Sequence, residues 1–503
     1  MKRYFMGIDI GTYESKGVLV DETAQVIAYG AVPHKMECPK PGYAEHDAEG
    51  TWWHDFCMLS KQLLAQSGID PKQIASVGCS TIAPCCLPVN RDLRPLRKAI
   101  LYGVDVRVGK EIRYLEERFG KDAIFQKCGT PVTSQAVGAK LLWIKNNEPE
   151  IHQKAYKFLT GSSYLVAKLT GKFVIDRYTA ACWVPLYNIA ADDWEDDVSL
   201  FCRRDQLAEC RWSDEIVGYV HAQAAKETGL AEGTPVVTGT ADASAEALSV
   251  GVLRPGNLML MYGSSIFIIH VVDKLTTDHR IWAGPYLFKG TYSMAAGMST
   301  SGTLTRWYKE QLARDLAEQA AQRGENEYAA IAQSAKHIPP GSEGLIVLPY
   351  FSGERTPIND VDAKGMIFGL NLNHTREHIY RACLEGIGYG ISQHFDIFRE
   401  RGVVTNKVMA VGGGTKNSDW IQIVSDICQQ TQHMAKEKTG AAYGDALLSA
   451  LAIGFYPSLE ALEREIELES SVVPDPSRKE VYANARRKYD LLYQSTREIM
   501  HMP

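Results

Sequence analysis

The sequence of 503 residues contains no apolar run long enough to cross a membrane. A membrane-spanning helix needs at least ~18 consecutive apolar residues. The longest apolar stretch, residues 446–455, is shorter and includes Ser449 and Gly454. The chain also begins in a strand-like pattern, without the apolar core and small-residue cleavage site of a secretory signal. These absences predict a cytoplasmic protein with no membrane partner.

The sequence also lacks an excess of positive charge. It has 54 Lys and Arg against 60 Asp and Glu, a formal net charge of -6, and no basic run of more than a few residues. Proteins that bind nucleic acid use clusters of Lys and Arg to neutralise phosphates. The composition therefore predicts no nucleic-acid partner.

Paired cysteine motifs are missing. The eleven cysteines are an odd number, they are scattered through the chain, and none forms a Cys-x-x-Cys pair. This distribution argues against a disulfide framework or a zinc site and favours reduced, buried thiols. We interpret the adjacent Cys85-Cys86 as small core residues, with a redox-active pair as the alternative.

Several catalytic motifs are absent as well. There is no Gly-x4-Gly-Lys-Ser/Thr loop, no His-Glu-x-x-His, and no Gly-x-Ser-x-Gly at a strand-to-helix turn. The run Gly386-x-Gly388-x-Gly390 lacks the spacing of a dinucleotide-binding loop and falls inside a helical pattern. These observations argue against a P-loop enzyme, a Rossmann dehydrogenase, a zinc protease and an α/β-hydrolase.

Alternating strand and helix patterns are present throughout and predict an α/β protein. The chain is too long for one ordinary core. The halves begin alike, because Tyr4–Val20 and Gly256–His270 both read as strand, glycine turn, strand. We therefore predict a duplicated pair of domains, residues 1–249 and 250–503, with two unrelated hairpins as the alternative. Helices are expected over residues 47–66, 158–169 and 375–399, among others.

Three glycine turns follow strands directly, at Asp9-Ile-Gly11-Thr12, Tyr262-Gly-Ser-Ser265 and Val411-Gly-Gly-Gly-Thr415. Glycine lets backbone N–H groups approach a phosphate, and the neighbouring hydroxyls add donors. One such turn is usually only a turn. Three of them, with Asp9 as a candidate outer ligand for Mg²⁺, predict a site for a nucleoside polyphosphate.

The middle of the chain, Thr238–Gly251, places Asp242 where a strand ends and an Ala-rich helix begins. Ligands of α/β proteins bind at this edge of a sheet. We expect Asp242 to be the N-cap residue, with its carboxylate held ionised by the N–H groups at the helix end. A plain capping role is the alternative on these residues alone.

Taken in order, motifs spread over the whole chain resemble the FGGY carbohydrate kinases, of the xylulose kinase-like type, within the actin/hexokinase/Hsp70-like ATPase fold. The resemblance extends from about Tyr4 to Tyr493. The motifs are Gly7-Ile-Asp-Ile-Gly-Thr12 with Lys16, Lys140-Leu-Leu-Trp143, Tyr164-Leu165, Leu169-Thr-Gly171, Gly239-Thr-Ala-Asp242, Phe351-Ser-Gly-Glu-Arg-Thr-Pro357, Gly365-Met-Ile-Phe-Gly-Leu370, His378 with Arg381-Ala-Cys-Leu-Glu-Gly386, and Gly412-Gly-Gly-Thr-Lys-Asn-Ser-Asp-Trp420.

The resemblance implies two actin-like (ribonuclease H-like) domains with a cleft between them, and it implies ATP and Mg²⁺ as cofactors. It also implies that Asp242 is the general base that accepts the proton of the attacking sugar hydroxyl. The residues it assigns to the nucleotide are Gly11, Thr12, Ser15, Lys16, Gly263, Ser264, Gly302, Arg306, Gly413 and Asn417. A solvated turn lysine is the alternative for Lys16.

The sugar contacts implied by the resemblance are Thr81, Tyr102, Asp105, Gln135 and Asp242 itself. The chain departs from the family around these positions. Tyr102 stands where a Trp is usual, Ile82-Ala-Pro84 replaces polar residues found in xylulose and glycerol kinases, and Ala243 replaces a polar neighbour of the base. A pocket without those hydrogen-bonding groups does not by itself specify glycerol or xylulose.

The sequence thus predicts ATP-dependent phosphorylation of a small sugar, with a ketopentose such as xylulose or ribulose as the leading substrate. A polyol, a hexulose or a sugar acid is the alternative substrate. Rivals from other classes are an actin- or Hsp70-like ATPase that acts on protein and a sugar sensor without catalysis. The sequence leaves a homodimer open as the quaternary state.

Overall fold

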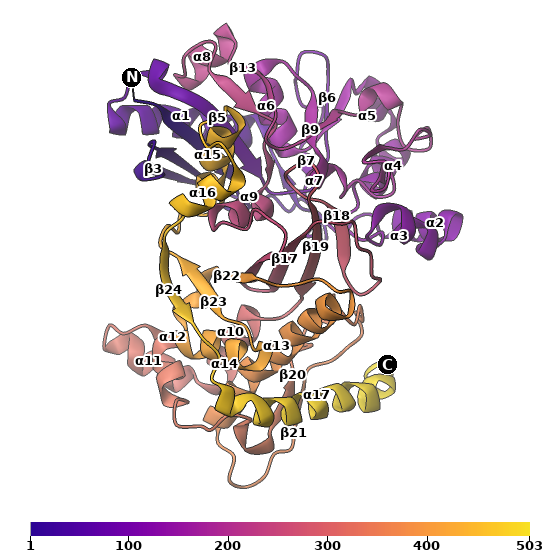
Figure 1. The fold of residues 1–503 in the computed structure, drawn as a ribbon. Helices are drawn as coiled ribbons and strands as arrows, with labels where there is room; N and C mark the ends of the chain where they lie inside the picture. The colour runs from indigo at the N-terminus through magenta and orange to yellow at the C-terminus, as the bar shows by residue number, and fades with distance from the viewer. Residues whose placement is uncertain (1, 503) are drawn as a thin grey trace. The chain divides into compact units, whose positions relative to one another are not determined.

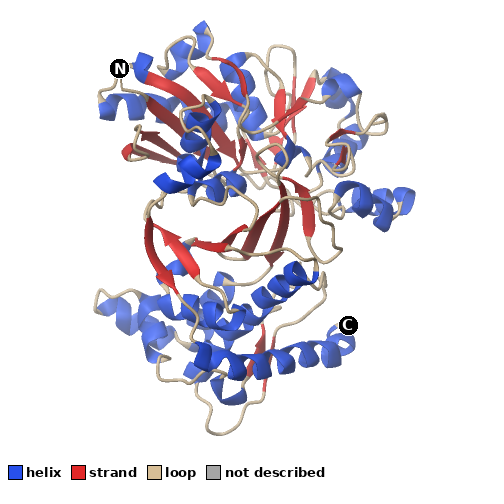
Figure 2. Cartoon of the chain, viewed as in Figure 1, coloured by secondary structure: helices blue, strands red, loops and turns tan. Residues whose placement is uncertain are grey.

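A computed structural model of the chain describes residues 2–502 and contains two compact units (Figures 1 and 2). The first unit comprises Met1–Pro255, Val271–Ser293 and Glu437–Glu467. The second comprises Gly256–His270, Met294–Lys436 and Leu468–Pro503. The chain therefore passes between the two units several times.

The first unit is built on a seven-stranded sheet in the order β13-β14-β5-β1-β2-β3, with β15 beside β5. β1, β2 and β3 form an antiparallel meander, whereas β1, β14 and β15 each run parallel to β5. The carboxyl ends of β1, β5 and β15 therefore meet at one edge of the sheet. The strands are β1 Tyr4–Ile10, β2 Glu14–Val20, β3 Val26–Pro33, β5 Ile74–Thr81, β13 Ile216–Tyr219, β14 Pro235–Val237 and β15 Thr240–Ala241.

Helices from distant parts of the chain pack around this sheet. α15 comes from the last seventh of the sequence, yet it contacts β1, β5 and α9, and Figure 1 shows its yellow-orange ribbon beside the indigo and violet strands. Its apolar small residues make that close approach possible. The helices of this unit are α1 His54–Ser67, α2 Gly109–Phe119, α3 Lys121–Cys128, α4 Val137–Asn147, α5 Pro149–Lys154, α6 Gly161–Thr170, α7 Arg177–Ala180, α8 Ala222–Thr228, α9 Asp242–Ser249, α15 Ala441–Ala452 and α16 Leu459–Glu465.

The second large sheet repeats the strand order of the first. Its order is β18-β19-β17-β16-β22-β23-β24, in which β16 pairs antiparallel with β17 and parallel with β22. This is the arrangement of β1 with β2 and β5, as expected of a duplicated unit. The strands are β16 Asn257–Tyr262, β17 Ile266–Val272, β18 Trp282–Pro285, β19 Tyr292–Met298, β22 Lys407–Val411, β23 Gln432–Ala435 and β24 Leu468–Val472.

The long helix α13 (Arg376–Glu400) lies in the second unit, where the helical pattern over residues 375–399 predicts it. The helix expected over residues 158–169 differs at its start, because Lys157–Leu159 forms β8 and pairs with β6 before α6 begins at Gly161. The other helices of the second unit are α10 Gly302–Leu312, α11 Arg314–Gln322, α12 Glu327–Ser334, α14 Ser418–Cys428 and α17 Lys479–Met500.

Short strands form small two-stranded sheets beside the two large ones. They are β4 Glu45–His46 with β7 Ala99–Ile100, β6 Leu87–Val89 with β8, β9 Val174–Asp176 with β12 Glu209–Arg211, β10 Tyr187–Asn188 with β11 Asp193–Trp194, and β20 Ile346–Leu348 with β21 Met366–Phe368.

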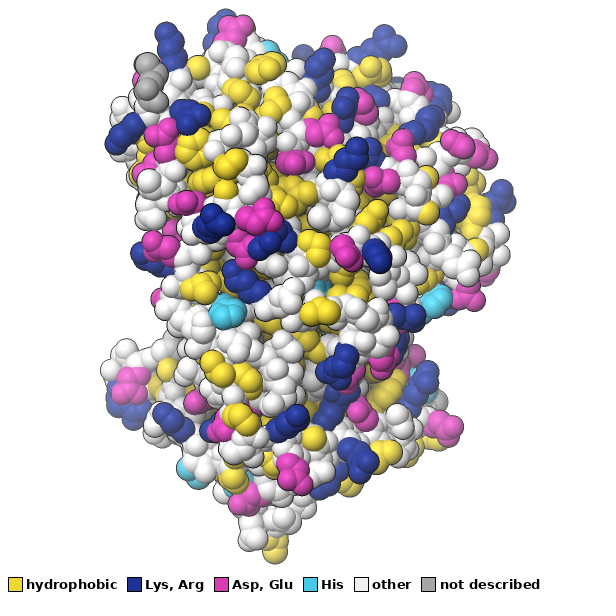
Figure 3. Space-filling view, viewed as in Figure 1, with side chains coloured by type: hydrophobic (Ala, Val, Ile, Leu, Met, Phe, Trp, Pro, Cys, Tyr) yellow, Lys and Arg dark blue, Asp and Glu magenta, His cyan; other side chains and the backbone are white. Residues whose placement is uncertain are grey.

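The strands of both large sheets are mostly buried, as in sheets covered on both faces. Within residues 2–502, no helix has the length and apolar character needed to span a bilayer. On the face shown in Figure 3, basic and acidic side chains lie side by side. All eleven cysteines are free thiols, and Cys85 and Cys86 are fully buried, although Cys38 is exposed.

Candidate active site

The first part of the site lies where β1, β5 and β15 end. The strand register places Asp9 beside Ser80, Ser80 beside Thr240, and Thr81 beside Ala241. A parallel sheet brings such residues to one edge, where α/β proteins bind their ligands. Asp9 and Asp242 therefore come together although 233 positions separate them in the sequence.

Asp242 is the first residue of α9, and the N-cap position belongs to Ala241. The expected N-cap role of Asp242 is therefore wrong by one residue. Its Oδ1 accepts a hydrogen bond from the backbone N–H of Ala243 at 2.8 Å. The carboxylate thus still accepts a hydrogen bond from the helix end, but the donor is the N–H of Ala243 in the first turn.

Three further residues surround Asp9 and Asp242. Ser80 Oγ lies 3.0 Å from Asp9 Oδ1 and 2.6 Å from Asp445 Oδ2. A hydroxyl has one hydrogen to donate, so both contacts are complete only when one of these carboxyl groups carries a proton. Glu246 follows Asp242 by one turn on α9. Its side chain packs against Gly440, just before α15, because a Cβ added to Gly440 would lie 2.4 Å from Glu246 Oε2. The acidic cluster thus consists of Asp9, Asp242, Glu246 and Asp445.

Burial shapes the electrostatics of the acidic cluster. It raises the pKa of Asp9 to about 8, with repulsion from Asp242 as the second cause. It also raises the pKa of Asp242 to about 7, with repulsion from Glu246 adding to the effect. The pKa values of Glu246 and Asp445 are raised for the same first reason. The expectation that the helix end keeps Asp242 fully ionised is therefore wrong, since loss of hydration outweighs the donor at the helix end.

Lys16 is a cation that faces this cluster. Its charge lowers the pKa values of Asp9 and Glu246. The Lys16 side chain is 40% exposed and makes only a long contact, 3.5 Å, with Glu14. One partly exposed lysine does not balance four carboxyl groups, so the cluster attracts protons or a further cation.

The first glycine turn joins β1 to β2 beside this cluster. Gly11 closes the turn by donating its N–H to the carbonyl of Glu14 at 3.0 Å. The Thr12 hydroxyl lies 3.1 Å from the hydroxyl of Tyr102. The structure thus connects a residue predicted for the nucleotide with one predicted for the sugar.

Ser15 does not face outward from this turn. It is fully buried, and its hydroxyl donates to Asp55 Oδ2 at 2.7 Å. The same Asp55 oxygen lies 2.9 Å from Nδ1 of His34. These contacts use the Ser15 hydroxyl inside the protein and do not favour its predicted contact with ATP.

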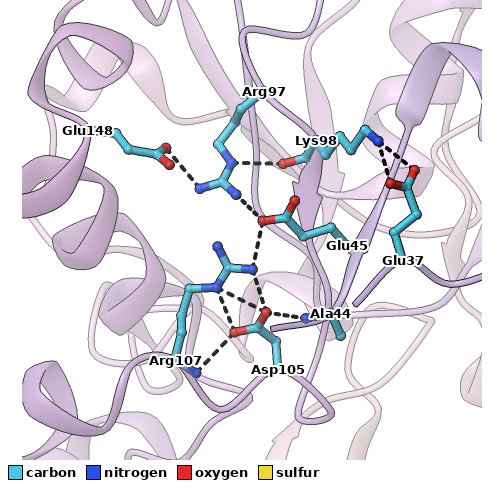
Figure 4. A network of polar contacts seen from close by, with 8 residues as sticks. All are labelled: Glu37, Ala44, Glu45, Arg97, Lys98, Asp105, Arg107 and Glu148. Carbon is cyan, nitrogen blue, oxygen red and sulfur yellow. Dashed lines mark hydrogen bonds and ion pairs between the residues drawn. The ribbon is translucent and has the colours of Figure 1, made fainter. Parts of the chain in front are cut away.

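Asp105, predicted as a sugar contact, lies in a buried ion-pair network (Figure 4). It pairs with Arg107 at 2.6 Å and accepts the N–H of Ala44 at 2.7 Å. Arg107 also pairs with Glu45 at 2.8 Å and stacks on Tyr43, with 3.9 Å from the guanidinium carbon to the ring centroid. Both oxygens of Asp105 are engaged, and the network favours a structural role.

The remaining predicted sugar contacts are dispersed around the end of β5. Thr81 is buried, and its hydroxyl donates to the carbonyl of Ile82 at 3.2 Å. Gln135 is half-buried and packs close to Gly103, since a Cβ added there would lie 2.8 Å from Gln135 Cγ. Gly103 follows Tyr102 directly, so Gln135 and Tyr102 belong to one region of the first unit.

The second unit brings its own glycine turns together. The N–H of Gly302, at the start of α10, donates to the carbonyl of Gly263 at 3.0 Å, and Ser301 donates to Ser264 at 3.1 Å. Gly412 lies against Tyr262, where an added Cβ would be 2.7 Å from the Tyr262 carbonyl oxygen. Gly413 borders open space. The glycine turns of three segments therefore lie together, and the N–H groups of Ser301 and Gly302 join two of them.

Two predicted nucleotide residues of this unit are engaged elsewhere. Asn417 caps α14 by accepting the N–H of Trp420 at 3.1 Å, and it donates to Tyr380 at 3.1 Å. The Arg306 side chain is 67% exposed and pairs with Glu310 one turn on. Arg306 and Glu310 thus form an ordinary ion pair at the surface.

The acidic cluster was only half predictable. Asp445 and Glu246 were missed because no strand-to-turn motif marks them. A sequence signal exists for Asp445, since a charged residue interrupts an otherwise small and apolar helix at a buried position. Ser80 gave no signal beyond being the penultimate residue of β5.

A magnesium ion fits one side of this site. No group of three or more His, Cys, Asp or Glu side chains among the described residues is arranged to hold a metal ion. Mg²⁺, however, usually takes one or two carboxylates and completes its shell with water and substrate phosphates. Asp445 Oδ1 is buried without a hydrogen-bond partner among the described residues, next to Asp9. The donor set is therefore suited to Mg²⁺ held together with a phosphate ligand.

The fold and the site define a two-domain α/β kinase of the actin-like ATPase fold. A solved structure of xylulose kinase from Rhodospirillum rubrum has a TM-score of 0.93 and 29% identity, covering 99% of this chain and 100% of that chain. The N-terminal domain of the FGGY family of carbohydrate kinases matches residues 4–249, and the C-terminal domain of the family matches residues 258–453. The chain belongs to the FGGY family of carbohydrate kinases, and it is a sugar kinase that uses ATP.

Two curated relatives carry different substrate names. A protein named xylulose kinase from Escherichia coli (strain K12) is 29% identical over 501 residues, 99% of this chain and 100% of the relative. A protein named gluconokinase from Bacillus subtilis (strain 168) is 27% identical over 470 residues, 92% of this chain and 90% of the relative. The family resemblance therefore gives the reaction class and leaves the sugar open.

Proposed function

We propose that this kinase transfers the γ-phosphate of ATP to a hydroxyl of a ketopentose such as xylulose or ribulose, with Asp242 as the general base. The observation that carries the proposal is the solvent access and the raised pKa of Asp242. It retains partial access to solvent at the carboxyl edge of the sheet, and burial raises its pKa to about 7. A base of that strength accepts a hydroxyl proton efficiently near neutral pH.

In this proposal the substrate hydroxyl donates its proton to a carboxylate oxygen of Asp242 as the oxygen attacks phosphorus. The N–H of Ala243 holds the Asp242 carboxylate in place through a hydrogen bond of 2.8 Å. Phosphoryl transfer depends mainly on positioning and on stabilising charge on the phosphoryl oxygens. One well-placed carboxylate therefore suffices for the proton.

The nucleotide is assigned to the glycine turns. The hydroxyls of Thr12 in the first unit and Ser264 in the second, with the backbone of Gly413, would supply donors for phosphates, while Gly11, Gly263 and Gly302 use their N–H groups to close these turns. Lys16 adds a charge. Asp9 would hold Mg²⁺ through water or directly, and the ion would neutralise charge on the phosphates. A cation there would also favour the ionised form of Asp9, whose pKa is raised by burial and by repulsion from Asp242.

Tyr102, a predicted sugar contact, lies 3.1 Å from the Thr12 hydroxyl, so a sugar bound at Tyr102 would lie beside the first glycine turn. A ketopentose is favoured because xylulose kinase is the name of the relative and of the solved structure that align over 99% of this chain. A sugar acid is the second candidate, since the gluconokinase relative aligns over 92% of it.

A substrate panel tests this proposal. Purified protein with Mg·ATP is mixed with xylulose, ribulose, other pentuloses, hexuloses, polyols and gluconate in turn, and ADP release is measured. Release that depends on a pentulose supports the proposal. Release that depends only on gluconate or a polyol replaces the substrate, and release without any sugar favours the protein-directed ATPase.

A further inference from the structure

The first glycine turn is held from behind by a histidine. His34 follows β3 directly, and its Nε2 lies 3.0 Å from the carbonyl oxygen of Gly11. The backbone N–H of His34 also donates to the carbonyl of Tyr13 at 2.8 Å. The residue therefore contacts the turn at two successive points, once through its ring and once through its backbone.

The other ring nitrogen of His34 faces a carboxylate. Nδ1 lies 2.9 Å from Asp55 Oδ2 on α1, and the two side chains are only 8% and 4% exposed. Ser15 donates its hydroxyl to the same Asp55 oxygen at 2.7 Å. Asp55 is thus fixed by β2 and α1, and it orients the imidazole toward Gly11.

Both ring nitrogens of His34 have polar partners. The carbonyl oxygen of Gly11 is an acceptor, so Nε2 contacts it as a donor. Nδ1 lies beside the Asp55 carboxylate and 3.3 Å from the Ser15 hydroxyl. The imidazole ring is therefore held on one side by these two residues and faces the turn with the other.

Two other histidines lie near this pair. His46 on β4 packs edge-on against His34 with ring centroids 5.1 Å apart, and its Nδ1 accepts the Nε1–H of Trp52 at 3.0 Å. Burial lowers the pKa of His46 to about 4, so this ring stays neutral. The largely exposed His54 lies 3.3 Å from the other oxygen of Asp55. Of these three histidines, His34 is the one whose ring lies at the carbonyl of Gly11.

We propose that His34 is a positioning residue for the nucleotide: its imidazole ring, oriented by Asp55, holds the carbonyl of Gly11 so that the turn presents Thr12 to a phosphate. The proposal rests on the proposed role of Gly11 and Thr12 in binding ATP. The side chain acts through the backbone of the turn and touches no substrate. A free carbonyl at Gly11 would let the peptide rotate toward the phosphate and repel it.

Two substitutions separate the two ring contacts of His34. The amide nitrogen of Gln reaches the position of Nε2, and that of Asn reaches the position of Nδ1. His34→Gln therefore keeps a donor for Gly11 and loses the contact with Asp55, whereas His34→Asn does the reverse. His54→Asn is the matched control, because it makes the same substitution at a neighbour of Asp55 that has no described contact with the turn.

We expect His34→Asn to raise KM for ATP about fivefold, the effect of losing one hydrogen bond. The kcat at saturating ATP should change by less than about threefold, since the base is untouched. His34→Gln should restore most of the ATP affinity. His54→Asn should behave as the parent. Equal effects of Asn and Gln, or a loss confined to kcat, would overturn the proposal.

Hydrogen exchange of the peptide that spans residues 7–20 tests the same proposal without turnover. This segment should exchange faster in His34→Asn than in His34→Gln, in the absence of ATP and sugar. Equal exchange in both variants would refute the positioning role. If the parent protein shows no sugar-dependent turnover, the proposed function fails, whereas the exchange result still judges the role of His34.

Discussion

Replacing Asp445 with Asn tests the electrostatics of the acidic cluster. Asp445 is fully buried, and its pKa is raised well above the usual range by burial and by Asp9. A carboxyl group with a raised pKa keeps its proton in the folded state at pH values where the unfolded chain has lost it. The contribution of this bound proton to the free energy of unfolding is fully present below the pKa that the group has in the unfolded chain. It is lost as pH rises through the pKa that the group has in the folded protein.

The magnitude follows from the linkage of protons to folding. Each proton held only by the folded state lowers the free energy of unfolding by about 1.4 kcal/mol per pH unit as pH rises. Asp9, whose pKa is raised to about 8, contributes the same trend up to that pH. Asp445→Asn removes one such proton, and the Asn oxygen still accepts from Ser80. Between pH 6 and pH 8, the free energy of unfolding should therefore fall less in the variant than in the parent, by up to about 3 kcal/mol.

Urea unfolding followed by tryptophan fluorescence at several pH values measures this difference. Asp92→Asn, at an exposed turn, is the matched control and should follow the parent. The reasoning would be refuted by an Asp445→Asn variant whose stability falls with pH as steeply as that of the parent. A variant less stable than the parent at pH 8 would also contradict it.

Three further substitutions probe the site. Tyr102→Phe removes the 3.1 Å contact with Thr12, so KM for ATP or for the sugar should rise about threefold, the effect of one neutral hydrogen bond; steady-state kinetics with unchanged constants would contradict this. Gly412→Ala puts a Cβ 2.7 Å from the Tyr262 carbonyl oxygen at φ 91°, so it should destabilise the protein by roughly 1–3 kcal/mol and weaken ATP binding, as measured by thermal unfolding and calorimetry. Arg306→Ala removes an exposed pair with Glu310, so KM for ATP should stay within about twofold; a tenfold rise would restore its predicted role in binding the nucleotide.

The fold was predictable because local signals agree with it. The hairpins β1–β2 and β16–β17, each followed by a parallel strand later in the chain, carry strand patterns and glycine turns that are visible in the sequence. The alternation of strands and helices and the family motifs gave the α/β class. What the local signals did not give is the return of α15 to the first unit, because tertiary packing of small residues, not a motif, decides it.

The site was predictable to the extent that motifs lie at strand ends. Asp9, Gly11 and Asp242 were predicted in this way, and the structure places Asp9 and Asp242 in one acidic cluster. Ser15 and Asp105 were assigned to ligands by position, yet the structure engages both internally, since a buried hydroxyl or carboxylate needs partners within the protein. Asp445 was missed for the converse reason, because its importance arises from contact with Ser80, 365 residues away in the sequence.

The degree of ionisation of Asp242 could not be derived from the sequence. A capping position suggests an ionised carboxylate, whereas the packed structure raises its pKa to about 7 through loss of hydration and repulsion from Glu246. Sequence spacing reports the donor at the helix end but not the other acids around it. The pKa of Asp242 therefore depends on how the acidic cluster is arranged in three dimensions.

The central claim, that Asp242 accepts the proton of the sugar hydroxyl, is tested most directly by sugar-dependent ADP formation in Asp242→Asn. Asn has nearly the same shape and no basic oxygen, so Mg·ATP binding should stay near normal, as checked by calorimetry, while kcat falls at least about 100-fold. The parent should lose kcat/KM as pH falls below about 7, the pKa of Asp242, and the variant should not show that limb. Turnover of Asp242→Asn within about tenfold of the parent would contradict the account.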